Sequence, residues 1–206
     1  PITNDNTEYE LIENDHVSFK TFQNKNILLI QPEALKIITE NAFYKISHFY
    51  RSSHLKLLKK ILDDKEASKN DHFVALTMLK NANISASGVL PMCQDTGTAI
   101  INGYRGKNIF TDFNEEKELS RGIYNSYQKN NLRFSQLAPI SMFEEKNTNN
   151  NLPGEINLYT AEGDEYKFTF IQKGGGSANK SFLYQQTKAI LNPKDLKKFL
   201  YEIIIS

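Results

Sequence analysis

The sequence predicts a mixed α/β fold of the α+β type, in which helices pack around a mixed β-sheet. Three observations predict this class. Apolar residues recur at helical spacing through residues 32–86. Two later runs, 156–160 and 166–172, alternate apolar and polar side chains with the period of two that is typical of strands. The chain has 206 residues, 39% of them hydrophobic, which suffices for one substantial core or two small ones.

The N-terminal part, residues 1–31, is predicted to be a polar arm followed by a β-hairpin. Residues 23–26, Gln-Asn-Lys-Asn, supply turn chemistry between two apolar runs. Pro32 suits the first position of a helix, because the N–H that proline lacks has no helical partner there. We interpret the segment 32–86 as a helical scaffold. The predicted elements are strands over 17–22 and 27–30 and helices over 32–51, 55–62 and 73–84.

Residues 87–206 are predicted to form an α/β part, which completes a single domain over 1–206. The pattern changes at Gly88, where a loop punctuated by Pro91 and Gly97 begins. A second loop, rich in asparagine, covers 146–151. The predicted elements are strands over 98–102, 108–111, 156–160 and 166–172, and helices over 115–128, over 178–191 and from Pro193 onward.

Composition argues against several classes of protein. Lys and Arg number 25 against 24 Asp and Glu, so the net charge of +1 gives no reason to expect a nucleic-acid partner. No run approaches the roughly 18 apolar residues of a membrane span. The single cysteine, Cys93, excludes an internal disulfide and a self-contained multi-cysteine zinc site. Composition alone predicts that such a lone cysteine is a small buried hydrophobic residue.

A glycine loop is the first candidate for chemistry. Residues 173–180 read Lys-Gly-Gly-Gly-Ser-Ala-Asn-Lys, between a predicted strand and a predicted helix. Successive glycines let several backbone N–H groups converge, and the start of a helix adds the positive end of its dipole. With Lys173 and Lys180 at its ends, the loop is predicted to bind a phosphate or a carboxylate. A nucleoside-triphosphate loop needs a glycine where this chain has Asn179, so the sequence does not match that motif.

A second candidate is the cysteine loop, which we define as residues 88–97. Its Asp95-Thr96-Gly97 is the triplet of aspartic proteases, but the apolar run before it and the second triplet are both missing. A nucleophilic Cys93 needs a nearby histidine, and the chain's histidines all belong to the N-terminal half. A metal-ligand role for Cys93 needs further ligands from elsewhere.

Arg133 is the third candidate. The chain has only four arginines among its 25 basic residues, so lysine is its default cation. An arginine then marks a place where a planar, bidentate group is needed for a carboxylate. Arg133 follows the predicted helix 115–128 and precedes an irregular stretch, which is a common location for a site. Arg121, inside that helix, is predicted to be structural.

Four blocks of the sequence resemble one family. Residues 91–101, Pro-Met-Cys-Gln-Asp-Thr-Gly-Thr-Ala-Ile-Ile, resemble the cluster-ligand loop of class I fumarate hydratases, the iron–sulfur fumarases. The other blocks occur in the family's order and extend the resemblance over nearly the whole chain. The related two-subunit tartrate dehydratases share the cysteine loop and the glycine loop, but the intervening blocks resemble the single-chain fumarases. These further blocks are residues 119–124 with 131–136, 147–159, and 173–189.

The resemblance implies a reversible hydration of fumarate to L-malate. It implies a [4Fe–4S] cluster held by three cysteines, with one iron left open as a Lewis acid. By position, Cys93 is implied to be the first cluster ligand. Gln94 and Asp95 are implied to contact the substrate, and Asp95 to transfer a proton. Arg133 and the backbone N–H of Gly176 are each implied to bind a substrate carboxylate.

The chain departs from the family pattern at its C-terminal end. The other two cluster cysteines and the C-terminal domain are not in this sequence, and the apolar run 203–205 lacks a helix cap. We therefore expect the N-terminal part of a longer enzyme, inactive alone. The resemblance implies a homodimer at full length, located in the cytosol or in mitochondria. Two alternatives stay open: a hydro-lyase acting on tartrate or another dicarboxylate, and a stand-alone anion- or nucleotide-binding module that uses the glycine loop.

Overall fold

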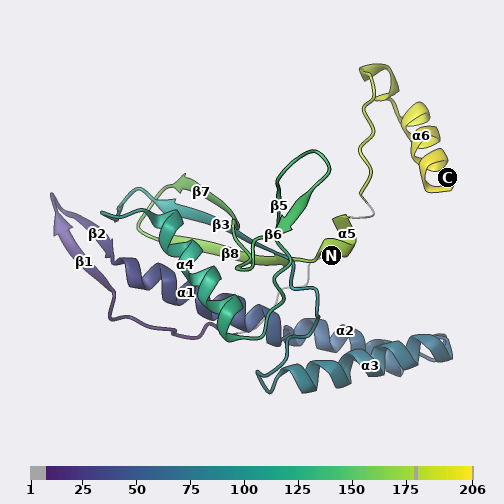
Figure 1. Cartoon of the computed structure of the whole chain (residues 1–206), viewed down its shortest axis with the longest axis horizontal. Coiled ribbons are helices and arrows are strands. Elements are labelled where there is room, and N and C mark those ends of the chain that lie inside the picture. Colours follow the sequence, from purple (N-terminus) through teal and green to yellow (C-terminus); the bar gives the residue numbers. More distant parts are fainter. Residues whose placement is uncertain (1–7, 179–180, 206) are drawn as a thin grey trace. The chain divides into compact units, whose positions relative to one another are not determined.

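The computed structural model describes residues 8–178 and 181–205, and the chain divides into two compact units (Figure 1). The units comprise residues 1–175 and 176–206, so the boundary falls at the glycine loop, inside the predicted α/β part. The combination of helices with mixed sheets confirms the predicted fold class. Among the described residues, no helix has the length and apolarity needed to cross a bilayer.

The N-terminal hairpin forms as predicted. Strands β1 (Val17–Phe22) and β2 (Lys25–Ile30) pair antiparallel. Gln23 and Asn24 connect them with φ angles of 47° and 60°. Two successive residues with positive φ match the right-handed twist of a tight hairpin, and asparagine tolerates this conformation well. On its other edge, β2 pairs in parallel with the short strand β4 (Ile109–Phe110).

The central sheet has the order β7-β3-β8. Its middle strand β3 (Thr98–Gly106) runs parallel to β7 (Glu155–Ala161) and antiparallel to β8 (Tyr166–Lys173). This is the mixed sheet that the sequence predicts. Side chains of β3 alternate in burial, with Ala99 and Ile101 fully covered. The alternation places one face of β3 against the helices.

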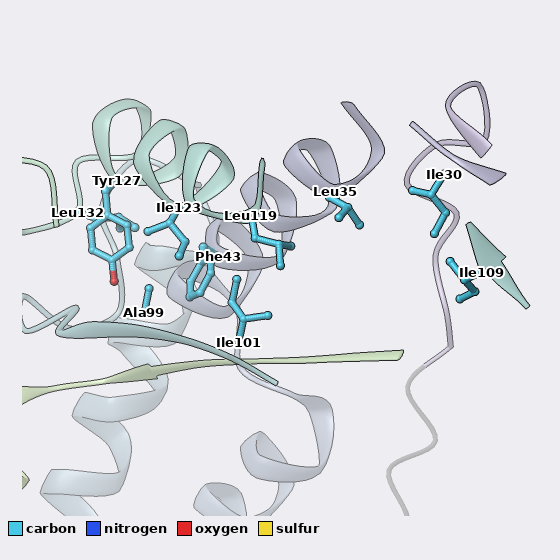
Figure 2. Close-up of a cluster of buried hydrophobic side chains, with 10 residues drawn as sticks. All are labelled: Ile30, Leu35, Phe43, Ala99, Ile101, Ile109, Leu119, Ile123, Tyr127 and Leu132. Carbon is cyan, nitrogen blue, oxygen red and sulfur yellow. The ribbon is translucent and has the colours of Figure 1, made fainter. Parts of the chain in front are cut away.

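Two helices cover that face of the sheet. Helix α1 (Pro32–His48) begins with its proline in the first turn, and α4 (Glu115–Lys129) begins at Asn114, whose side chain accepts a hydrogen bond from the backbone N–H of Lys117. The two helices pack side by side (Figure 1). Figure 2 shows the resulting core, in which side chains of both helices point toward β3. Its buried members include Phe43, Leu119, Ile123, Tyr127, Ala99 and Ile101.

Helices α2 (Ser52–Asp63) and α3 (Lys69–Ser85) form a helical hairpin. Ser68 and Asp71 make a capping box at the start of α3, because each side chain accepts a hydrogen bond from the other's backbone N–H. The helical segment predicted over 32–86 is therefore confirmed. Its three helices differ from the predicted bounds by a few residues at each end.

The predicted break within β3 is wrong. The sequence indicated an interruption over 103–107, because two glycines lie there, but β3 continues to Gly106. These glycines serve close packing instead of turning the chain. A Cβ at Gly103 would lie 2.8 Å from the Leu158 side chain, and one at Gly106 would lie 2.5 Å from the carbonyl oxygen of Gly163. The short strands β5 (Leu137–Pro139) and β6 (Glu145–Asn147) were not predicted.

The predicted helix over 178–191 is also wrong. Helix α5 covers only Gly175–Ala178, residues 181–187 have no regular secondary structure, and a single 3-10 turn covers Lys188–Ile190. Phe182 and Leu183 are exposed, so no packed apolar face stabilises a helix there. The last predicted helix is confirmed as α6 (Pro193–Ile205).

We predict that Phe43→Ala lowers the free energy of unfolding by about 3–5 kcal/mol, because it empties a fully buried position at the centre of the core. Phe73→Ala, on the exposed side of α3, is the matched control and should change stability by no more than ~0.5 kcal/mol. Urea unfolding followed by far-UV circular dichroism measures both. Equal losses for the two variants would contradict this description of the core.

Candidate active site at one edge of the central sheet

Strand pairing brings the cysteine loop and the glycine loop together. The cysteine loop leads directly into β3 at Thr98, and β8 ends at Lys173, directly before the glycines. Because β3 and β8 are antiparallel and Thr98 pairs with Lys173, both loops leave the sheet at the same end of these two strands. Two segments that lie about 80 residues apart in the chain therefore become neighbours.

Two glycines allow these loops to approach each other closely. Gly97 has a φ angle of +56°, and a Cβ there would lie 1.9 Å from the carbonyl oxygen of Lys173. A Cβ at Gly174 would lie 2.9 Å from Oδ2 of Asp95. Gly97 has backbone in the place of a Cβ and a positive φ, so glycine is required there, whereas a Cβ at Gly174 would displace the end of the Asp95 side chain. The Asp95 carboxylate consequently lies against the backbone of the glycine loop.

Cys93 and Asp95 line a pocket of about 360 Å³. The walls come from three elements: the cysteine loop, the C-terminal part of α1, and β8. Cys93 is exposed, so the expectation of a buried cysteine from composition alone is wrong. Gln94 is exposed as well. The side chains that line the pocket in the described part of the chain include no histidine, so nothing there supports a histidine-activated nucleophile.

Hydrogen bonds from three helices hold the cysteine loop in place. The backbone N–H of Met92 donates to the carbonyl of Ser47 in α1 at 2.8 Å, and the Met92 carbonyl accepts from Nδ2 of Asn81 in α3 at 2.7 Å. Tyr127 in α4 donates its hydroxyl to the carbonyl of Thr96 at 2.9 Å. The loop is thus positioned by the rigid scaffold on both sides of Cys93.

Arg133 follows α4 and lies on a segment attached to the same loop. Its carbonyl accepts a hydrogen bond from Oγ1 of Thr96 at 3.0 Å, and Oε1 of Gln136 accepts one from Oγ1 of Thr98 at 3.2 Å. Residue Arg133 is exposed. The structure therefore brings the predicted carboxylate-binding arginine beside the cysteine loop with its side chain accessible to a ligand.

The other predicted anion-binding residues are placed less directly. Gly176 is exposed and is the first residue of the second unit, so its role stays a prediction. Lys180 lies outside the described residues. The long helix expected behind the glycine loop is absent from the described residues, and the four residues of α5 replace it.

Burial raises the pKa of the Tyr127 phenol. Removal from water raises the pKa of its phenol to about 12, the hydrogen bond from Gln172 acts in the opposite direction, and the nearby negative charge of Asp95 raises the pKa further. The side chain is fully buried in the core cluster shown in Figure 2. A neutral phenol remains a hydrogen-bond donor, so it anchors the loop carbonyls over the whole physiological pH range.

The sequence pattern missed the residues that support the site. In the sequence Tyr127 lies on the apolar face of the predicted helix 115–128, and nothing there indicates that its hydroxyl also contacts the carbonyl of Gly97 at 3.2 Å. Gln172 accepts a hydrogen bond from Oγ of Ser47 at 3.0 Å and donates one to the Tyr127 hydroxyl at 3.4 Å. A polar residue inside an apolar period is the one local signal that could have identified such residues.

The donor set determines what metal centre this chain could serve. Within residues 8–178 and 181–205, no group of three or more His, Cys, Asp or Glu side chains could hold a metal ion. Cys93 is exposed beside a pocket, and a single accessible thiolate fits one ligand position of an iron–sulfur centre. The described part of the chain therefore offers a single cysteine ligand and contains no complete metal-binding group.

Comparisons with known proteins identify the family of this chain. Residues 37–206 match the family model "Fumarate hydratase (Fumerase)". The chain is 53% identical over 203 residues to Fumarate hydratase 1, mitochondrial, of Leishmania major. It is 52% identical over 202 residues to Fumarate hydratase class I, anaerobic, of Escherichia coli K12. Each match covers 98% of this chain but only 37% of the relative, so the chain spans well under half the length of these proteins.

We predict that Gly97→Ala destabilises the protein more than Gly163→Ala does. Both glycines have positive φ, which costs a substituted residue about 1–2 kcal/mol. Only Gly97 is packed against backbone, whereas a Cβ at Gly163 would meet open space. The Gly97 variant should therefore lose a further ~1–3 kcal/mol in urea unfolding, the usual cost of overpacking. Equal losses would show that the two loops do not pack as described.

We predict that the stabilising effect of the Tyr127 hydroxyl declines at high pH. The folded protein holds this proton more tightly than the unfolded chain, because the folded pKa is about 12 against 10. The contribution is fully present below the unfolded pKa and is lost as the pH rises from about 10 toward about 12. The free energy of unfolding, measured from about pH 8 to about pH 11, should therefore fall more steeply for the unaltered protein than for Tyr127→Phe. Parallel curves would contradict the shift.

Proposed function

This chain belongs to the fumarate hydratase family, and we propose that it forms the N-terminal part of an iron–sulfur hydro-lyase that reversibly hydrates fumarate to L-malate. One observation carries the proposal: antiparallel β3 and β8 bring a loop with an accessible cysteine and carboxylate against a glycine-rich loop. The Arg133 carbonyl is hydrogen-bonded to Thr96 of the same loop, which supports a site that combines a thiol, a carboxylate and an arginine. This set matches the needs of dicarboxylate hydration.

Cys93 would provide one of the three thiolates that hold a [4Fe–4S] cluster. When bound, the cluster would supply a Lewis-acidic iron for the hydroxyl and the adjacent carboxylate of malate. The remaining ligands would come from the part of the full-length protein that follows this chain. The partial coverage of the relatives supports this division of the site.

Asp95 would move a proton at the hydroxyl that is added or removed. Its carboxylate is held against the glycine loop by the close contact at Gly174, which restricts the directions in which it can face the substrate. Gln94, next to it and exposed, would donate a hydrogen bond to the substrate from its amide.

The two carboxylates of the substrate require cationic or N–H donors. The Arg133 guanidinium would bind one of them with two parallel hydrogen bonds. The backbone N–H of Gly176 would bind a carboxylate as well. The full-length protein would act as a homodimer, an expectation that sedimentation analysis of that protein can test.

We predict that fumarate is the preferred substrate of the full-length protein over mesaconate and tartrate. Mesaconate is fumarate with an added methyl group, and tartrate is malate with an added hydroxyl. A pocket shaped for fumarate and malate discriminates against either added group by steric exclusion or an unpaired polar atom. Comparison of kcat/KM for the three substrates measures this preference. A higher kcat/KM for tartrate would favour the related hydro-lyase activity instead.

We predict that Cys93→Ser in the full-length protein abolishes both cluster content and fumarate hydration, because the serine hydroxyl is a far poorer iron ligand than a thiolate. Anaerobic reconstitution with iron and sulfide, read from the absorbance at about 400 nm, measures cluster content. Ser141→Ala, at an exposed serine outside the pocket, is the control and should retain both properties.

The isolated residues 1–206 provide a second arm of the same experiment. With a single cysteine they should hold no stable cluster and show no turnover. An absorbance equivalent to one cluster per chain, together with fumarate hydration by the isolated chain, would contradict the division of the site. Unchanged cluster content in the Cys93 variant would contradict the role of Cys93.

A further inference from the structure

Asn151 is a fully buried polar residue at the centre of the site's support. Its exposed fraction is 0%, although asparagine is usually found at the protein surface. Its φ angle is +57°, a conformation that asparagine tolerates better than most residues. A buried amide must have its donors and acceptors paired, so its hydrogen bonds indicate what it does.

The Asn151 side chain connects the cysteine loop with the segment that carries Arg133. Its Nδ2 donates to the carbonyl of Gly97 at 2.8 Å. Its Oδ1 accepts from the backbone N–H of Ser135 at 2.8 Å and from that of Gln136 at 3.0 Å. One side chain therefore spans from the last residue of the cysteine loop to the residues two and three positions after Arg133.

This bridge requires an amide. The Gly97 end needs a donor, and the other end needs an oxygen that accepts two N–H groups at once. Aspartate has the oxygens without the donor. Alanine has neither, and serine is too short to reach both partners. The groups at the two ends of the bridge therefore require asparagine at position 151, for a reason separate from its positive φ angle.

Other hydrogen bonds hold the Arg133 segment without Asn151. Phe134 accepts a hydrogen bond at its carbonyl from Nδ2 of Asn147 at 2.8 Å, and the Gln136 carbonyl accepts one from the backbone N–H of Thr148 at 3.0 Å. These bonds attach the segment to the asparagine-rich loop. Oγ1 of Thr96 also bonds the segment to the cysteine loop, at the Arg133 carbonyl. Asn151 adds a second attachment, in which one buried side chain joins the Gly97 carbonyl to the N–H groups of Ser135 and Gln136.

We propose that Asn151 is a positioning residue that sets the position of Arg133 relative to Cys93 and Asp95, an inference that rests on the proposed carboxylate-binding role of Arg133. Without the bridge, the Arg133 segment keeps its fold but shifts against the cysteine loop. The guanidinium then binds the substrate carboxylate poorly. That carboxylate is present in the substrate and in the transition state alike. Weaker binding of it by Arg133 therefore raises KM more than it lowers kcat.

The test uses the full-length, cluster-loaded protein and compares Asn151→Ala and Asn151→Asp with Arg133→Lys and with the double variant Asn151→Ala/Arg133→Lys. Asn151→Ala should raise KM for fumarate by about tenfold or more and change kcat by less than about threefold. Asn151→Asp keeps the acceptor and loses the donor, so it should raise KM too. In the double variant KM should stay within about twofold of that of Arg133→Lys, because both changes remove the same interaction.

Asn157→Ala is the matched control. Asn157 also donates its amide to an oxygen of a neighbouring strand, Oδ1 of Asn102 at 3.2 Å, but it does not line the pocket. Its variant should leave KM unchanged. Independent, multiplying effects in the double variant would overturn the proposal, as would an unchanged KM in a folded Asn151→Asp protein.

Amide hydrogen exchange separates this proposal from the proposed function. In Asn151→Ala, the N–H groups of Ser135 and Gln136 should exchange about tenfold faster or more, whereas Arg133→Lys should leave their exchange unchanged. Absence of turnover in the unaltered full-length protein would overturn the proposed function alone. Unchanged exchange in Asn151→Ala would overturn the bridge whether or not the protein is active.

Discussion

The antiparallel pairing of β3 with β8 is the constraint on which the site depends, since it places the start of one strand and the end of the other at a single edge of the sheet. The register pairs Thr98 with Lys173, the strand residues from which the two loops extend. A one-residue slip would turn Ala99 and Ile101 away from the core, so burial of these side chains also determines how the loops meet. Core packing and site geometry therefore have a common cause.

Tyr127 contributes both to the packing of the core and to the geometry of the site. Its ring packs in the core near Phe43, with ring centroids 6.3 Å apart, and its hydroxyl holds two carbonyls at the end of the cysteine loop. Burial that stabilises the fold also raises the pKa of this phenol, which extends its protonated, donating form to higher pH. Asn151 extends the same support from Gly97 to the segment after Arg133. The exposed reactive groups thus rest on a buried polar framework, which is how a rigid scaffold positions residues on loops.

The described residues of this chain supply only part of the proposed site. Cys93 and Asp95 line a pocket of about 360 Å³, and the described residues contain no complete metal-binding group. Relatives that share half of their residues with this chain over the matched region are nearly three times as long. A site shared between two parts of a longer protein accounts for both facts. It also explains why Cys93 is exposed, because an accessible thiol can take part in a centre that other residues complete.

Local patterns in the sequence determined the helices α1 to α4, the strands β7 and β8, the N-terminal hairpin and the family, because helical and strand periodicity and motif spacing are properties of neighbouring residues. They also identified Cys93, Asp95 and Arg133 as site candidates. The continuous course of β3 could not be predicted from local patterns. Its glycines pack closely against Leu158 and Gly163, which lie far away in the chain. The failure of the helix over 178–191 has the same origin, because an apolar helix face is stable only where something packs against it. Only the tertiary structure decided which strands are neighbours, that Gly97 packs against Lys173 and Gly174 against Asp95, and that Asn151 is buried. The reason is that strand pairing and burial depend on contacts between residues that are distant in the sequence.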